Sequence, residues 1–196
     1  MRNKRVEKLV KLALLCAMSL VLMYVVRFPI IPALFFLEYD MADVPILIGT
    51  FMYGPIAGLA ITAVVSVLQA VTVSASSGWI GCIMHFFATG AFAVIAGVIY
   101  RRRHNIRGAI EGLLLGAAAM VIIMVPFNYY LSPIFISGSG MSYAEAQSYI
   151  WSYMWSFVAF NALKALINSA VTFVVYKPLS RLFKKEFLKK EPHPGK

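Results

Sequence analysis

Apolar residues dominate six stretches of the chain, and most polar residues lie between them. The stretches cover residues 9–27, 43–53, 56–73, 79–100, 108–131 and 149–176. All except the second approach or exceed the roughly 20 apolar residues that a helix needs to cross a bilayer. The pattern predicts an all-α integral membrane protein with six transmembrane helices. Residues 1–183 would form its single domain, and residues 184–196 a basic cytoplasmic tail.

The second stretch is short, and Gly54 and Pro55 separate it from the third. A Gly-Pro pair marks a turn, because proline fits poorly inside a helix. Residues 43–53 would span about 16 Å, half of the hydrocarbon core. We therefore expect this helix to begin within the membrane, with Asp43 as its N-cap. Residues 28–40 would form a re-entrant outer loop, which is tolerated at that depth where protein covers it or where it lines a cavity.

The charged residues set the predicted orientation. The 196 residues include 18 Lys and Arg but only 8 Asp and Glu. Basic residues cluster at 2–11, 101–107 and 177–196, and the positive-inside rule places all three clusters, with both termini, in the cytoplasm. The basic residues flank apolar segments and do not form a basic face, so they fit anionic lipid headgroups better than nucleic acid.

Lys164 lies within an apolar stretch, away from the basic clusters. A cation at such a depth costs about 2.5–3.5 kcal/mol on insertion scales. We expect no acidic side chain at matching depth in another helix, because Glu111 lies near a cytoplasmic end and the loop acids lie on the outer side. Lys164 is therefore expected to face a bound ligand, and a buried lysine that stays uncharged is the alternative.

Two asparagines accompany this lysine. Asn161 lies one helical turn before Lys164, and Asn128 follows Pro126 in the fifth stretch. Together the three side chains offer amide donors, amide acceptors and a cation to one planar polar heterocycle, on which aromatic rings can stack. Hydrogen bonding between helices is the competing explanation for the asparagines.

Smaller signals complete the set of candidate residues. Glu38 and Asp40 flank Tyr39 in the outer loop, where they suit recognition of hydroxyl groups or simple solvation. His85 fits a hydrogen-bonded core residue better than a ligand-binding one. Ala13 and Ala17 are small residues one turn apart, which allow the close approach of another helix.

Several catalytic and energy-coupling motifs are missing from the sequence. It contains no P-loop, no H-E-x-x-H motif and no G-x-S-x-G motif. Cys16 and Cys82 lie inside apolar stretches without metal-ligand spacing, and we expect no metal site. The predicted helices also lack the intramembrane acids that proton-coupled carriers use. The sequence therefore favours a binding subunit that depends on other proteins for energy, and we predict no enzymatic activity.

Five short motifs, in this order along the chain, match one family of transport proteins. They are Phe36-Leu37-Glu38-Tyr39-Asp40, Asp43-Val44-Pro45, Gly54-Pro55-Ile56-Ala57-Gly58, Gly90-Ala91-Phe92 and Asn161-Ala162-Leu163-Lys164. The chain resembles the riboflavin-specific substrate-binding subunit, or S component, of energy-coupling factor (ECF) transporters over about residues 1–183. The resemblance implies a bacterial plasma-membrane protein with the six-helix S-component fold. Riboflavin would be its transported ligand, with no cofactor.

The resemblance also implies roles for individual residues. Asn128, Asn161 and Lys164 match the positions that contact the isoalloxazine ring. The loop with Glu38, Tyr39 and Asp40 would close the pocket and hold the ribityl chain. His85 departs from the asparagine expected at its position.

Partners follow from the same resemblance. Ala13 and Ala17 match the motif by which S components meet a transmembrane coupling subunit, and two cytoplasmic ATPases would supply energy. The alternatives are an S component for flavin mononucleotide or another vitamin, an autonomous small-molecule carrier, and a membrane enzyme that uses Lys164 as a Schiff base.

Overall fold

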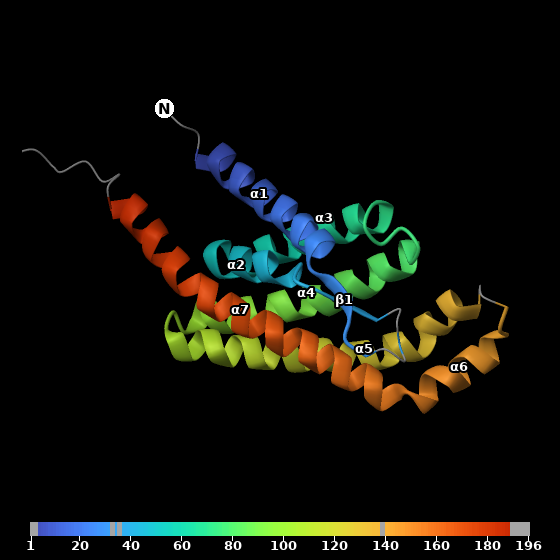
Figure 1. Cartoon of the computed structure of the whole chain (residues 1–196). Coiled ribbons are helices and arrows are strands. Elements are labelled where there is room, and N and C mark those ends of the chain that lie inside the picture. The colour runs from blue at the N-terminus through green and yellow to red at the C-terminus, as the bar shows by residue number, and fades with distance from the viewer. Residues whose placement is uncertain (1–3, 32–33, 35–36, 138–139, 189–196) are drawn as a thin grey trace, which may run out of the picture.

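The chain folds into a bundle of helices with one short two-stranded sheet (Figure 1). The computed structural model describes residues 4–31, 34, 37–137 and 140–188. The elements in chain order are α1 (Lys4–Val25), β1 (Arg27–Pro29), β2 (Glu38–Asp40), α2 (Asp43–Tyr53), α3 (Pro55–Val71), α4 (Gly78–Arg102), α5 (Ile106–Ser137), α6 (Tyr143–Ser152) and α7 (Met154–Leu188). The helical stretches predicted from the sequence are all present, and α2 has the predicted bounds.

Four of the described helical segments are long and apolar enough to cross a membrane. They are Lys4–Val25, Gly78–Arg102, Ile106–Ser137 and Met154–Tyr176, and α2 and α3 are shorter apolar helices. Many large apolar side chains are also exposed on the bundle; Ile56, for example, is 79% exposed. Lipid chains solvate such exposed apolar side chains, whereas soluble monomers rarely expose large contiguous apolar patches. The prediction of a helical membrane protein is therefore confirmed.

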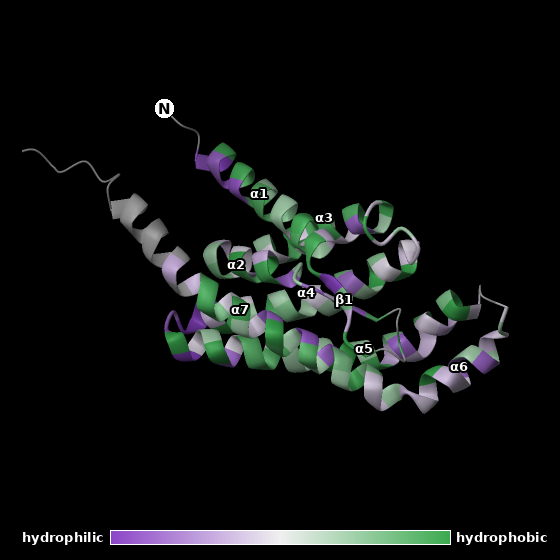
Figure 2. Ribbon diagram, viewed as in Figure 1, coloured by the Kyte–Doolittle hydropathy of each residue, from purple (hydrophilic) through white to green (hydrophobic). Residues whose placement is uncertain are grey.

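The basic segments gather at one end of the bundle. In Figure 1 the start of α1, the α4–α5 connection and the end of α7 all lie toward the left of the view, while α6 lies at the right. Figure 2 shows hydrophilic residues at the start of α1 and at the α4–α5 connection. The charge clusters at 2–11 and 101–107 thus share one side, as the positive-inside rule requires, within the part of these ranges that is described.

The predicted turn between the second and third stretches is present. Gly54 has φ 93°, a conformation that favours glycine, and Pro55 begins α3. The Gly54 N–H donates to the carbonyl of Thr50 at 2.8 Å and closes the last turn of α2. Proline at the first helical position lacks only an N–H that would have no partner within the helix.

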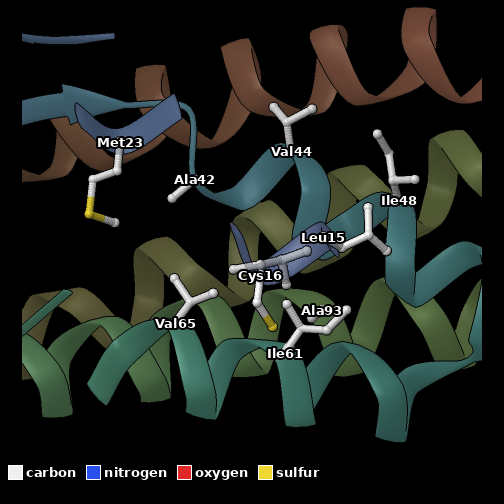
Figure 3. Packing of buried hydrophobic residues seen from close by; sticks show 10 residues of the cluster. Leu15, Cys16, Met23, Ala42, Val44, Ile48, Ile61, Val65 and Ala93 are labelled. Carbon is white, nitrogen blue, oxygen red and sulfur yellow. The ribbon is translucent and has the colours of Figure 1, made fainter. Parts of the chain in front are cut away.

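Figure 3 shows how α2 is enclosed by its neighbours. Leu15 and Cys16 of α1 and Ile61 of α3 pack together with Val44 and Ile48 of α2. Every residue of α2 from Asp43 to Phe51 is buried. A helix that is apolar on all sides belongs at the centre of a bundle. Because α2 is central, its first residues are carried into the interior instead of facing solvent.

The segment before α2 forms an antiparallel hairpin. Arg27 pairs with Asp40, Phe28 with Tyr39, and Pro29 with Glu38. The sequence predicted an irregular re-entrant loop over residues 28–40, of which residues 32–33 and 35–36 lie outside the described part. Strand pairing satisfies backbone groups that would otherwise be costly to bury. The hairpin adds one short sheet to the predicted all-α fold.

The residues Ser142, Tyr143, Ala144 and Glu145 have the sequence pattern of a capping box, and α6 begins there. The Ser142 hydroxyl accepts from the Glu145 N–H, and the Glu145 carboxylate accepts from the Ser142 N–H, which completes the capping box. Hydrogen bonds from Ser142 hold the pKa of Glu145 below its ordinary value. The helix is not continuous, however, since a turn at Tyr153 separates α6 from α7.

Candidate functional site

A group of buried polar side chains lies where β2 and α2 meet α3, α4 and α7. We call it the polar cluster, and its members are Tyr39, Asp40, Asp43, Ser66, His85, Thr89, Lys164 and Asn168. Buried polar groups are costly unless they are paired, so their concentration at one place suggests a functional centre.

Lys164 forms an ion pair inside the cluster. Its ammonium donates to Asp40 Oδ2 at 2.6 Å, and the two side chains are only 10% and 13% exposed. The prediction that no acidic residue reaches the depth of Lys164 is therefore wrong. The chain itself supplies the counter-charge, so the lysine does not need a ligand to be tolerated in the bundle.

The hairpin explains how Asp40 reaches this depth. Asp40 ends β2 and lies three residues before Asp43, the first residue of the buried helix α2. Its Oδ1 accepts from the Ala42 N–H at 3.0 Å, and its backbone carbonyl accepts from Asn168 Nδ2 at 3.2 Å. The carboxylate is thus fixed between the start of α2 and the side chains of α7.

Asp43 is buried completely and does not serve as the predicted N-cap. The N-cap position of α2 is Ala42, without a side-chain capping bond. Asp43 Oδ1 instead accepts from the Thr89 hydroxyl at 2.8 Å, and Oδ2 accepts from Asn168 Nδ2 at 2.9 Å. The expectation that the helices lack buried acids fails at this residue.

Asn168 connects three parts of the cluster. Its Nδ2 donates to Asp40 and to Asp43, while its Oδ1 accepts from the Tyr39 hydroxyl at 2.9 Å. Asn168 and Thr89 were not predicted as site residues, and Asp43 was predicted only as a helix cap. One signal was present, because Asn161, Lys164 and Asn168 repeat at helical spacing along one face of α7.

His85 has one bonded nitrogen and one free nitrogen. Its Nδ1 lies 2.8 Å from the Ser66 hydroxyl. Its Nε2 lies 3.7 Å from Asp43 Oδ1, too far for a hydrogen bond, and is buried without a hydrogen-bond partner. The interpretation of His85 as a satisfied core residue therefore holds for Nδ1 only.

The two predicted ring-binding asparagines are held by their own helices. Asn128 Nδ2 donates to the Met124 carbonyl at 2.7 Å, and its Oδ1 accepts from Ser132 at 3.1 Å. Asn161 Nδ2 donates to the Phe157 carbonyl at 2.8 Å. Both asparagines are buried, at 1% and 3% exposure, and these hydrogen bonds do not join them to the polar cluster.

The remaining candidates lie at the edges of the bundle. Glu38 pairs with Arg27, whose guanidinium also donates to the Val73 carbonyl at 2.5 Å. The structure thus brings together Tyr39, Asp40 and Lys164, but directs Glu38 toward Arg27. Ala13 and Ala17 are exposed on α1. Among the described residues, no group of three or more His, Cys, Asp and Glu could hold a metal ion.

Comparison with known proteins identifies the family to which the chain belongs. Residues 7–176 match the family model "ECF transporter, substrate-specific component". The chain belongs to this family. S components are substrate-binding subunits of transporters, so the predicted family and the predicted lack of enzymatic activity are confirmed. The Schiff-base alternative is thereby excluded.

Curated relatives agree with the family. The riboflavin transporter FmnP of Bacillus subtilis is 34% identical over 128 residues, which cover 65% of this S component and 67% of the relative. The riboflavin transporter RibU of Streptococcus thermophilus is 29% identical and covers 94% and 87% of the two chains. RibU of Staphylococcus aureus is 28% identical, with 94% of each chain covered.

Solved structures support the same fold. The S component of a bacterial ECF transporter superposes with a TM-score of 0.77 at 26% identity, covering 92% of this chain and 99% of the other. The S component for biotin from an ECF-type transporter gives a TM-score of 0.54 at 15% identity, which shows a shared fold alone.

Proposed function

We propose that this S component binds riboflavin from outside the cell and delivers it inward as part of an ATP-driven ECF transporter. The observation that carries the proposal is the buried, charged pair of Lys164 and Asp40 in a chain whose curated relatives are riboflavin transporters. A transport subunit needs a polar centre that can exchange internal contacts for contacts with a ligand. A lysine has three donors, so this ammonium can turn toward a ligand carbonyl.

The ligand contacts follow from the chemistry of the side chains. Lys164, Asn161 and Asn128 would hold the isoalloxazine ring, since its carbonyl oxygens accept from amide and ammonium donors. Tyr39 and Asp40 would bind hydroxyl groups of the ribityl chain. Glu38 would join them in the same loop, where its pairing with Arg27 supports the hairpin.

The membrane topology of the proposal uses six crossings with both termini in the cytoplasm. The crossings would be α1, α2, α3, α4, α5 and α7, with α6 on the outer side. Gly54 and Pro55 support the separation of α2 from α3, and the common location of the basic segments supports the orientation. The hairpin β1–β2 would be the re-entrant element, entering from outside above α2.

The energy would come from partner proteins in a bacterial plasma membrane. Ala13 and Ala17 are exposed along α1, beside the exposed Leu14 and Met18. Small residues at this spacing allow a partner helix to approach closely. We assign this face to the transmembrane coupling subunit, which would connect the S component to two cytoplasmic ATPases.

Binding of candidate ligands to the purified protein tests the ligand assignment. Quenching of flavin fluorescence should give tighter binding for riboflavin than for flavin mononucleotide, and unlabelled biotin should not compete. Tighter binding of the phosphorylated flavin or of another vitamin would support a different S component. Ion-dependent uptake into liposomes that contain only this chain would support an autonomous carrier instead.

The variant Ala17→Trp tests the partner face. Its bulky ring should block helix approach, so riboflavin uptake in cells should fall severalfold or more while the isolated subunit keeps its affinity. Ile122→Trp, at an exposed apolar position on α5 and therefore outside the α1 face, is the matched control. Equal uptake by the two variants would contradict the assignment.

A further inference from the structure

The polar cluster contains more acids than cations. Asp40 and Asp43 contribute two carboxylates, and Lys164 contributes one ammonium, which pairs with Asp40. Asp43 is fully buried, and the hydrogen bonds to its two oxygens come from the uncharged side chains of Thr89 and Asn168. A buried carboxylate is costly without a counter-charge. The single positive charge of Lys164 is therefore shared by the two acids, and it balances only one of them.

His85 is the titratable side chain next to Asp43. Its Nε2 faces Asp43 Oδ1 at 3.7 Å and is buried without a hydrogen-bond partner. The charged side chains that act on the ring are Asp43 from α2, Asp40 from β2 and Lys164 from α7. Burial of the ring opposes its protonation most strongly, the two acids favour it, and the nearby ammonium opposes it. Movement of Lys164 away from the ring therefore makes this histidine attract a proton more strongly.

The hydrogen bonds around His85 allow either charge state. In the neutral ring, a proton on Nε2 faces the carboxylate of Asp43, and Nδ1 accepts from the Ser66 hydroxyl. A hydroxyl can also accept, so a second proton on Nδ1 only requires the Ser66 hydroxyl to rotate. Protonation of the ring therefore breaks no hydrogen bond in the cluster.

The proposed ligand would change this balance. Riboflavin is uncharged near neutral pH, so it can offer acceptors to Lys164 but no negative charge. We propose that His85 is a proton-binding site that fills when the ligand draws Lys164 away from Asp40. A proton from solvent adds to the imidazole, and the resulting imidazolium lies beside Asp43. This inference rests on the proposed function, because it requires a ligand on Lys164.

The proposal fixes the sign of the pH dependence. When a ligand binds together with a proton, its affinity rises as the pH falls, by at most tenfold per pH unit for one proton. The dependence is confined to pH values at which the ring is neutral in the free protein and charged in the complex. The opposite sign would require proton release on binding.

Calorimetry of the wild-type protein tests the proposal directly. Riboflavin is titrated into the full-length protein in phosphate and in Tris, whose ionisation enthalpies differ strongly. The buffer-dependent part of the binding enthalpy should give an uptake of between half a proton and one proton per riboflavin. Fluorescence titrations between pH 6 and pH 8 should show tighter binding at lower pH.

Two histidine variants locate the proton. His85→Asn should reduce proton uptake to near zero and flatten the pH profile. His104→Asn is the matched control, because His104 is exposed and makes an edge-to-face contact with Tyr100, which is not part of the polar cluster. This variant should keep the wild-type proton uptake. If His85→Asn does not fold, His85→Gln and the wild-type proton count still decide the question.

The outcomes separate this inference from the proposed function. Riboflavin binding with no proton uptake and a flat pH profile would overturn the inference and leave the proposed function intact. Proton uptake that persists in His85→Asn would place the site elsewhere and also overturn it. A wild-type protein that binds no riboflavin would overturn the proposed function, and the inference with it.

Discussion

The two ends of α2 are held by the same helices through opposite chemistry. At its start, Asp43 is bound by Thr89 of α4 and Asn168 of α7. At its end, the ring of Phe51 packs against two tyrosine rings. The centroid of the Phe51 ring lies 4.7 Å from that of Tyr100 of α4 and 5.2 Å from that of Tyr176 of α7. One end is a charged and hydrogen-bonded centre, and the other is an aromatic contact.

The aromatic end contains one polar contact of its own. The hydroxyls of Tyr100 and Tyr176 lie 2.8 Å apart, so one of them donates a hydrogen bond to the other within the group. Edge-to-face aromatic contacts add to the area that is buried, and no polar ligand competes for them. This end of α2 therefore suits a permanent connection between helices.

The charged end suits a site where contacts within the protein are exchanged for contacts with a ligand. Its strongest contact, from Lys164 to Asp40, is an ion pair whose donor can serve another acceptor. Under the proposed function, the contacts that a ligand replaces lie at the start of α2, and the fixed contacts lie at its end. Substitutions at the two ends should accordingly separate ligand affinity from stability.

Lys164→Ala should have the largest effect, because it should lower both the stability of the protein and its affinity for riboflavin. It leaves Asp40 and Asp43 buried without their cation, which should lower the free energy of unfolding by about 3–5 kcal/mol. Riboflavin affinity should fall at least tenfold, or about 1.4 kcal/mol. Thermal unfolding in detergent and fluorescence titration measure the two effects.

A double variant sharpens this result. Lys164→Met combined with Asp40→Leu replaces the ion pair by apolar side chains, which often restores stability. Stability should recover in part, because Asp43 still lacks a cation, while riboflavin affinity stays low. Full riboflavin affinity in the double variant would show that neither side chain binds the ligand. Leu163→Ala, at an exposed neighbouring position, is the control for both measurements.

Phe51→Ala should have a large effect on stability alone. Removal of a buried phenylalanine typically lowers the free energy of unfolding by about 3–5 kcal/mol. Riboflavin affinity of the folded fraction should change less than threefold, because the aromatic group lies at the other end of α2. A tenfold loss of affinity would remove the distinction between the two ends.

Asn161→Ala should have the smallest effect on stability and a selective effect on binding. Its side chain donates to the Phe157 carbonyl of its own helix, so the free energy of unfolding should fall by about 1 kcal/mol. Riboflavin affinity should fall at least tenfold. Ser169→Ala is the matched control, since Ser169 is also buried on α7 and also bonds within its helix, to the Ala165 carbonyl. Equal affinities of the two variants would contradict a ligand contact for Asn161.

Much of the fold was predictable from the sequence. The bounds of α2 and the turn at Gly54 and Pro55 match the predictions, and the capping box at Ser142 follows a local sequence pattern. These features depend on local chemistry, such as the missing N–H of proline and the short reach of a capping side chain. The break at Tyr153 was not predicted, because neither glycine nor proline marks it.

The candidate site was predicted only in part. Lys164 was identified from its depth, whereas Tyr39 and Asp40 were identified from the outer loop and the family resemblance. The structure brings the three residues together. Asp40 was not predicted as the partner of Lys164, because an acidic residue in a short polar segment is typical of a loop on the outer side. Asp43 was likewise interpreted as a helix cap, although both of its oxygens bond to other helices.

The sequence by itself determined that the chain is a helical membrane protein of the S-component family, since hydropathy, turns and short motifs are properties of neighbouring residues. Only the tertiary structure decided the charge balance at its centre. Asp40 and Lys164 are 124 residues apart, and they meet because a hairpin and a buried helix bring the acid to α7. The depth of a side chain in a bundle depends on which elements surround it, and no local pattern records that arrangement.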